Sequence, residues 1–125
     1  MSTLDQVKEN LDSAGKSSIE LLSEQELDLV KQVKDTYESM VLIPCTSCNY
    51  CIPCPEDVDI PRILRIYNDG IMFEKVKEAG KDYILWVPAG AKADNCVVCR
   101  ECEEKCPQHI PISDWMSKIH QEYTS

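Results

Sequence analysis

The stretch CTSCNYCIPCP, residues 45–55, places four cysteines within ten positions and follows the last of them with a proline. A second stretch, CVVCRECEEKCP, residues 96–107, repeats the arrangement with one extra residue before its fourth cysteine. The two runs contain all eight cysteines of the 125-residue chain. Thiols at such short and regular spacing are typical of metal ligands, so the chemistry of these runs decides the fold as well as the function.

Disulfide bonds and thiol redox catalysis do not account for the two runs. The N-terminus, MSTLDQVKENLDS, lacks the basic start and the apolar run of a signal peptide. The expected compartment is therefore the cytoplasm, where thiols stay reduced. Cysteines three residues apart in a tight loop also seldom all find partners with disulfide geometry. A redox CxxC pair needs only two thiols.

The spacing favours iron–sulfur clusters over zinc. A four-cysteine zinc site normally uses two CxxC pairs separated by a longer loop, because one ion about 2.3 Å from each sulfur is wrapped from two sides. Cysteines spaced C-x2-C-x2-C can instead each reach a different iron of one [4Fe–4S] cluster, and the second run matches the bacterial ferredoxin pattern C-x2-C-x2-C-x3-C-P in every position. We therefore expect two [4Fe–4S] clusters, with a structural zinc module that mediates assembly as the alternative.

The ferredoxin pattern also predicts which cysteines share a cluster, because the fourth cysteine of each run binds the cluster of the other run. The first run has two residues before its fourth cysteine where three are usual, so Cys54 is the least regular ligand. The plain alternative is that each run holds its own cluster. The crossed assignment gives these two ligand sets: Cys45, Cys48, Cys51 and Cys106 for the first cluster, and Cys96, Cys99, Cys102 and Cys54 for the second.

Composition and charge exclude several classes of partner. The chain has a formal net charge of -9, so nucleic acid and anionic membranes would repel it. Its most apolar stretch, MVLIPC, is far too short to span a bilayer. One Phe and two Trp predict a thin hydrophobic core, and ligation of metal by both halves of the chain would then supply folding free energy. The acidity also suits a basic redox partner protein.

The rest of the chain predicts an all-α fold, in which two N-terminal helices precede two cysteine loops that each feed a short helix. Thr3 with Gln6, and Ser23 with Glu26, form capping boxes at the starts of the first two helices. The polar residues 13–18 separate these helices. The second helix carries an apolar stripe at helical spacing, made of Leu27, Val30, Val33, Tyr37 and Met40.

Asp59 is expected to cap the helix after the first run, and Gly70 is expected to end it. Residues 71–80 predict a further short helix, and residues 83–95 are expected to be mostly loop because proline and glycine interrupt them. The last helix is marked by apolar residues at helical spacing: Ile112, Trp115, Met116, Ile119 and Tyr123. The motif CPEDVDIPRIL after the first run is echoed by CPQHIPISDWM after the second, which predicts two copies of one loop-and-helix unit.

Several single residues have expected roles. Ile52, Val97 and Val98 lie between cysteines and are expected to cover the clusters and exclude water. His120 lies in the polar part of the last helix and is expected to be solvated. The chain shows no Gly-rich phosphate loop and no Ser/His/Asp arrangement, so the sequence assigns no catalytic residue and leaves open whether the chain is part of an enzyme.

Two long stretches, IPCTSCNYCIPCPEDVDIPRILRIYND and ADNCVVCRECEEKCPQHIPI, closely resemble the C-terminal extension of iron–sulfur-containing aldo/keto reductases. The short first run that ends in YCIPCP is part of that family's pattern. The cluster layout is also similar to that of the alpha-helical ferredoxins, which are two-cluster modules attached to larger oxidoreductases. The resemblance implies a dicluster ferredoxin-like domain over residues 23–125, which serves a reductase barrel domain in the parent chain.

The first residues, MSTLDQVKENL, resemble the last phosphate loop and helix of the reductase barrel. The family's Glu-Asn pair, matched by Glu9 and Asn10, contacts the adenine end of NADP there. The resemblance implies that residues 1–22 are a poorly ordered remnant of the barrel and that NADP binds only in the missing barrel domain. The family's Asp, Tyr, Lys and His catalytic set has no counterpart here.

This chain departs from the family at two positions where members commonly carry Gly, namely Asn49 and Arg100. Asparagine tolerates a left-handed backbone, whereas arginine adopts it at a cost. The turn before Cys102 is therefore expected to be either right-handed or strained.

Overall fold

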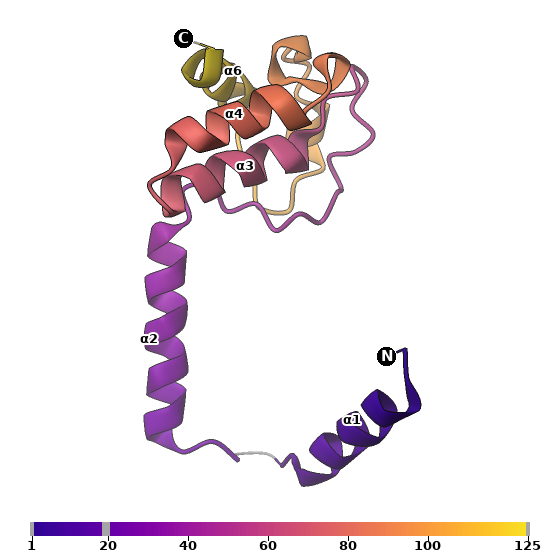
Figure 1. The fold of residues 1–125 in the computed structure, drawn as a ribbon, viewed down its shortest axis with the longest axis vertical. Helices are drawn as coiled ribbons and strands as arrows, with labels where there is room; N and C mark the ends of the chain where they lie inside the picture. The colour runs from indigo at the N-terminus through magenta and orange to yellow at the C-terminus, as the bar shows by residue number, and fades with distance from the viewer. Residues whose placement is uncertain (1, 19–20, 125) are drawn as a thin grey trace. The chain divides into compact units, whose positions relative to one another are not determined.

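The computed structural model describes residues 2–18 and 21–124 (Figure 1), and over these residues every regular element is a helix. The predicted all-α class is confirmed. The chain divides into two compact units, Met1–Tyr37 and Glu38–Ser125. Among the described helices, none is both long enough and apolar enough to cross a membrane.

In the first unit, helix α1 (Leu4–Lys16) begins with the predicted capping box. The Gln6 backbone N–H donates to Thr3 Oγ1 at 3.3 Å, and the Thr3 N–H donates to Gln6 Oε1 at 3.3 Å. The helix ends inside the polar stretch 13–18 that the sequence predicts as a break. The two hydrogen bonds satisfy N–H groups that have no partner within the helix.

Helix α2 (Glu24–Met40) begins with the second predicted capping box. The Ser23 N–H donates to Glu26 Oε2 at 2.8 Å, and the Glu26 N–H donates to Ser23 Oγ at 3.3 Å. Neither α1 nor α2 buries a residue. The predicted apolar stripe of α2 is exposed along its whole length, at Leu27, Val30, Val33, Tyr37 and Met40.

The second unit is built on three helices. Figure 1 shows α3 and α4 lying side by side, and α6 packs against both. Short helical turns lie in the chain between α4 and α6. The elements of this unit are α3 (Ile60–Met72), α4 (Val76–Trp86), the 3-10 turns η1 (Ala89–Ala91) and η2 (Ala93–Asn95), α5 (Glu101–Glu104) and α6 (Ile112–Thr124).

The hydrophobic core lies between these helices and includes the segments that lead into them. Three tyrosines fill its centre, with ring centroids 5.8 Å apart for Tyr67 and Tyr123 and 5.6 Å apart for Tyr83 and Tyr123. Burial of such large rings gives a small domain much of its apolar stabilisation. The buried core residues are Ile43, Val58, Ile60, Ile63, Leu64, Tyr67, Ala79, Tyr83, Val87, Ala93, Ile110, Ile112, Met116, Ile119 and Tyr123.

Gly70 and Gly80 lie inside helices, so the prediction that they end helices is wrong. A Cβ atom added at Gly70 would lie 2.6 Å from the Ala79 Cβ, and one added at Gly80 would lie 3.1 Å from the Tyr123 ring. Both glycines are therefore used for close helix packing. This tertiary requirement outweighs their low intrinsic helix propensity.

The predicted boundaries around α4 are also wrong. Residues 71–80 do not form a separate helix, because residues 71 and 72 complete α3 and α4 starts at Val76. Helix α4 continues through the first four residues of the predicted loop 83–95, since Tyr83 is drawn into the core. The remainder of that stretch forms the two 3-10 turns.

The close packing at Gly70 predicts the effect of a small substitution. Gly70→Ala should lower the free energy of unfolding by about 1–3 kcal/mol, because the new methyl group overlaps the Ala79 side chain. Gly90→Ala is the matched control, because an added Cβ there meets nothing within 4 Å. Its stability should be unchanged or slightly raised. Urea unfolding followed by far-ultraviolet circular dichroism measures both, and equal stability of the two variants would contradict the packing role.

Candidate metal centres

The eight cysteines line two adjacent pockets in the second unit, and we call these pockets site 1 and site 2. Site 1 has a volume of about 340 Å³ and site 2 of about 420 Å³, counting the part open to solvent. Cys51 lines both sites, so the sites share a wall. The cysteines of site 1 are Cys45, Cys48, Cys51 and Cys106, and those of site 2 are Cys51, Cys54, Cys96, Cys99 and Cys102.

Each site therefore receives a cysteine from the opposite run. Cys106, the last cysteine of the second run, lies with the first three cysteines of the first run, and Cys54 lies with the first three of the second run. The structure thus brings together the residues that the crossed pattern groups, and the assignment of each as a ligand stays a prediction. The second cysteine of each run, Cys48 or Cys99, is exposed, and the other six cysteines are half-buried.

The backbones of the two runs follow the same unusual path. Ser47 and Asn49 flank the second cysteine of the first run and have φ values of 54° and 65°. Val98 and Arg100 flank the second cysteine of the second run and have φ values of 59° and 63°. Of the two alternatives expected at Arg100, the strained left-handed one is present. A left-handed residue other than glycine or asparagine costs roughly 1–2 kcal/mol, so the second run carries more strain than the first.

A repeated strain of this kind fits a site for an anionic group. In the described part of the chain, the N–H groups of residues 46–50 and 97–100 donate to no backbone carbonyl. Left-handed residues in tight turns gather successive N–H groups into anion-binding concavities, a device common around iron–sulfur clusters. Donors near the sulfurs also raise the reduction potential of a bound cluster.

Buried aliphatic side chains form the dry walls of the two sites. Ile110 and Ile112 line site 1, whereas their counterparts in the repeated motif, Val58 and Ile60, line site 2. Each wall lies at the start of a helix, α6 for site 1 and α3 for site 2, and its residues belong to the hydrophobic core, so the core positions both walls. The expected covering residues behave differently, because Ile52, Val97 and Val98 are all exposed, although Val97 still lines site 2. The prediction is therefore wrong for Ile52 and Val98, which line neither site, and the buried aliphatic residues of the walls come from the segments after the runs.

The two sites differ in charge. Among the described residues, no charged side chain lines site 1, whereas two cations and two carboxylates line site 2. Nearby charges shift the potential of a bound cluster in opposite directions according to their sign. Two clusters with the same ligand type should therefore have distinguishable potentials. The charged residues that line site 2 are Arg100, Lys105, Glu56 and Glu101.

The thiols of Cys51 and Cys102 favour their protonated forms when no metal is bound. Burial raises the pKa of the Cys51 thiol, and the neighbouring Cys45, Cys48 and Cys106 raise it further. Burial, together with the nearby Glu103 carboxylate, raises the pKa of Cys102 to about 11. Because a metal binds the thiolate, uptake of iron must release these protons.

The arrangement of the donors fits a cluster better than a single ion. Within the described residues, no three His, Cys, Asp or Glu side chains are close enough together to hold one metal ion. A zinc ion would need four sulfurs about 2.3 Å from its centre. A cluster binds its four cysteines through four separate irons, so the sulfurs stand farther apart. The all-thiol donor set and the aliphatic walls suit this larger group.

Buried polar side chains hold the start of each cysteine run. Asn68 of α3 accepts a hydrogen bond from the Ile43 N–H at 2.9 Å and donates to the Ile43 carbonyl at 2.7 Å. The same carbonyl accepts from the Cys45 N–H at 2.7 Å. Before the second run, the Ala93 N–H donates to Tyr83 Oη at 3.0 Å, and the Cys96 N–H donates to the Ala93 carbonyl at 3.1 Å. Sequence patterns gave no signal for either anchor.

The helices after the runs are capped by carboxylates. Asp59 Oδ1 accepts from the Arg62 N–H at 3.4 Å, which confirms the predicted cap of α3. At the start of α6, Glu103 Oε1 accepts from both the N–H and the hydroxyl of Ser113. Since Glu103 lies between two cysteines of the second run, this cap fastens the run to α6.

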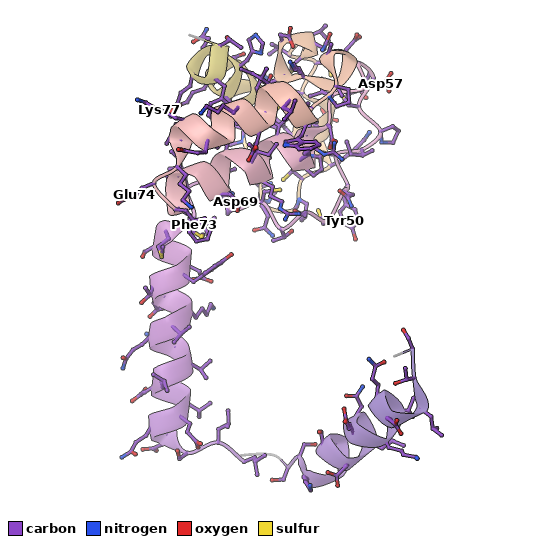
Figure 2. All side chains as sticks on the ribbon, viewed as in Figure 1. Tyr50, Asp57, Asp69, Phe73, Glu74 and Lys77 are labelled. Atoms are coloured by element: carbon purple, nitrogen blue, oxygen red, sulfur yellow. The ribbon has the colours of Figure 1, made fainter. Side chains whose placement is uncertain are left out.

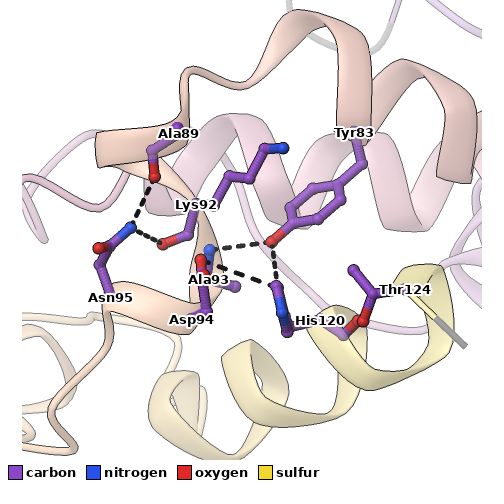
Figure 3. A network of polar contacts seen from close by, with 8 residues as sticks. All are labelled: Tyr83, Ala89, Lys92, Ala93, Asp94, Asn95, His120 and Thr124. Carbon is purple, nitrogen blue, oxygen red and sulfur yellow. Dashed lines mark hydrogen bonds and ion pairs between the residues drawn. The ribbon is translucent and has the colours of Figure 1, made fainter.

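His120 is not solvated as the sequence predicts. Its Nδ1 lies 2.9 Å from Tyr83 Oη, and its side chain is only 28% exposed. Figure 3 shows it beneath the turn that leads into the second run.

At the opposite end of the α3–α4 pair from Tyr50 and Asp57, Figure 2 places the exposed side chains of Phe73 and Glu74.

Comparison with known proteins agrees with this geometry. The family described as the 4Fe-4S dicluster domain matches residues 44–110, which contain both cysteine runs. The acetyl-CoA decarbonylase/synthase complex subunit alpha 1 of Methanosarcina acetivorans is 32% identical over 79 residues, and its namesake in Methanosarcina barkeri is 31% identical over 85 residues. These alignments cover 62% and 67% of this chain but only 8% and 9% of the relatives. No solved structure gives a significant match.

The left-handed backbone at Val98 predicts a stabilising substitution. Val98→Asn should raise the unfolding temperature of the cluster-loaded chain by a few degrees, because asparagine tolerates this conformation and a β-branched residue does not. Val97→Asn is the matched control, because Val97 is the adjacent valine, is 61% exposed and does not have a left-handed backbone. Thermal unfolding in oxygen-free buffer tests both. A gain in the control and none at residue 98 would show that strain is not the cause.

Proposed function

This chain belongs to the 4Fe-4S dicluster domain family, and we propose that it binds one [4Fe–4S] cluster at site 1 and one at site 2. The proposed ligands are Cys45, Cys48, Cys51 and Cys106 at site 1, and Cys96, Cys99, Cys102 and Cys54 at site 2. As an iron–sulfur electron-transfer module, it would carry single electrons between a redox partner protein and an oxidoreductase domain.

One observation carries this proposal, namely that each of the two pockets brings three cysteines of one run together with the fourth cysteine of the other. That grouping follows the ligand pattern of two-cluster ferredoxins. If each run held its own cluster, Cys106 would have to bind the cluster at site 2 although it lines site 1. Cys54 would likewise have to bind the cluster at site 1 although it lines site 2. The pocket linings therefore support the crossed assignment.

When bound, the clusters supply one-electron oxidation and reduction, and the polypeptide sets their potential and spacing. The cysteines hold each cluster, and the aliphatic walls exclude water from its inner side. Cys51 lies in the wall between the sites, so the path from one cluster to the other is short. The exposed Cys48 and Cys99 leave an edge of each site near solvent, where a partner protein can approach.

The host of this module is proposed to be an aldo/keto reductase-type enzyme of the cytoplasm. The resemblance over residues 23–125 supports it, with residues 1–22 as the end of the reductase barrel. NADP would bind in that barrel domain and not in this chain. The small share of the curated relatives that this chain covers agrees with a module inside a larger protein. The net charge of -9 supports a basic protein as redox partner and disfavours nucleic acid.

Metal analysis of an anaerobic preparation tests the proposal. The chain should be brown and contain about eight irons and eight sulfides, as two [4Fe–4S] clusters require. A colourless protein with about two zincs and no sulfide would support the zinc module instead, which the wide spacing of the donors disfavours.

Single cysteine variants test the crossed ligand sets. Cys106→Ala should leave the same residual electron paramagnetic resonance spectrum as Cys45→Ala, because both lose a ligand of site 1. Cys54→Ala should match Cys96→Ala for the same reason at site 2. Spectra of the reduced proteins, with iron content alongside, measure this. If Cys106→Ala instead matches Cys96→Ala, each run holds its own cluster.

A further inference from the structure

The hydroxyl of Tyr83 joins three elements of the second unit (Figure 3). Tyr83 lies on α4 and is fully buried. Its oxygen accepts a hydrogen bond from the Ala93 N–H at the start of η2, and it lies 2.9 Å from Nδ1 of His120 on α6. These contacts hold the turn immediately before the second cysteine run.

The two contacts constrain where the hydroxyl proton can lie. The Ala93 N–H can only donate, so the Tyr83 oxygen is the acceptor in that bond. The Tyr83 hydroxyl donates to His120 Nδ1 when the imidazole is neutral and carries its own proton on Nε2, and this is the tautomer that the proposal below uses. Burial raises the pKa of Tyr83, so the phenol keeps its proton.

The network extends to a proposed ligand of site 2. The Ala93 carbonyl accepts from the Cys96 N–H at 3.1 Å, and Ala93 itself is only 2% exposed. If the Tyr83 oxygen moves, a buried N–H loses its partner, which is unfavourable. The Ala93 N–H can regain a hydrogen-bond partner if the turn that contains it shifts, and such a shift moves Cys96 as well.

The first run is held by a different device. Asn68 anchors Ile43 through its amide group, which does not titrate. Only the anchor of the second run includes a histidine. The two sites therefore contain an internal comparison, in which one anchor can respond to protons and the other cannot.

We propose that Tyr83 and His120 are positioning residues for the cluster at site 2, and that the potential of this cluster depends on whether His120 is neutral. The inference rests on the proposed binding of clusters at the two sites. Neither residue is a ligand. They act through the Ala93 backbone on the loop that carries Cys96.

Protonation of His120 would remove the acceptor of the Tyr83 proton. Two charged groups of the preceding turn face this pair, since Asp94 Oδ1 lies 3.8 Å from His120 Nδ1 and Lys92 Nζ lies 5.8 Å from the centre of the Tyr83 ring. On α6 itself, the nearby Glu122 carboxylate already accepts from Tyr67 at 2.8 Å. A charged imidazole would turn toward Asp94, and the Tyr83 hydroxyl would lose its buried partner.

The expected effect on the potential has a definite sign. Positive charge stabilises the reduced form of a cluster, and helix α6, which carries His120, packs against the turn before Cys96, so we expect protonation of His120 to raise the potential of site 2. Linkage requires the reverse as well, so that reduction of this cluster favours proton uptake. In the balanced step, one electron from the reductant enters the cluster and one proton from solvent binds His120 Nδ1.

Potentiometric titrations of the reconstituted chain with dithionite as the reductant, at about pH 5.5 and 8, test the inference, since imidazoles generally titrate between about pH 5 and 8. At a fixed solution potential, the ratio of reduced to oxidised site 2 cluster should be about fivefold or more higher at the lower pH. The ratio for site 1 should stay constant. Residual spectra of Cys45→Ala and Cys96→Ala identify which signal belongs to which site.

Variants of the two histidines provide matched controls. His120→Gln keeps an acceptor for Tyr83 but cannot titrate, so the pH dependence at site 2 should vanish while the ratio stays near the wild-type value at high pH. His120→Leu offers no acceptor and should shift site 2 at both pH values. His109→Gln removes the only other histidine and should leave the wild-type behaviour intact. Tyr83→Phe should repeat the shift of His120→Leu if it folds.

The outcomes separate the two levels of inference. A wild-type chain that takes up no iron and sulfide would overturn the proposed function. A chain that takes up both clusters, but whose site 2 ratio is the same at the two pH values, overturns only the positioning role. A pH dependence that survives His120→Gln and disappears in His109→Gln has the same consequence.

Discussion

The second unit depends on the exchange of one cysteine between its two runs. Cys106 reaches the pocket of the first run and Cys54 reaches the pocket of the second, so neither half of the chain can complete its pocket alone. Helices α3 and α6 each begin six residues after the exchanged cysteine, at Ile60 and Ile112. The packing of these helices in one core holds the exchanged cysteines in place. Ligation of the clusters that we propose would add its free energy to that of this modest core.

The left-handed residues of the two runs carry a cost in conformational free energy that comes with forming the two pockets. Local preferences favour a right-handed backbone at Val98 and Arg100, yet both are left-handed, as are their counterparts Ser47 and Asn49. Strain that recurs at matching positions of both runs is not accidental. The anionic group that we propose at these turns would offset the strain, because clustered N–H donors stabilise an anion. The strain thus belongs to the site and not to the scaffold.

Local chemistry could be predicted from the sequence, and long-range packing could not. The cysteine spacing, the capping boxes at Thr3 and Ser23 and the cap at Asp59 depend on residues close in the chain, and each is present. Gly70 reads as a helix end because nothing nearby in the sequence reveals Ala79 against its α-carbon. His120 reads as solvated for the same reason, since Tyr83 lies 37 residues away.

The loop-and-helix repeat makes the remaining differences between its halves informative. Both halves place a left-handed residue three positions after the fourth cysteine, and both then start a 13-residue helix. Within the part of the chain that the structure describes, site 1 has no charged lining and an amide anchor, whereas site 2 has four charged residues and a tyrosine–histidine anchor. Identical ligands in identical loops would give two clusters of equal potential. Electrons move in a preferred direction only between unequal ones, so the asymmetry of the surroundings, and not the cysteines, is what gives such a module a direction.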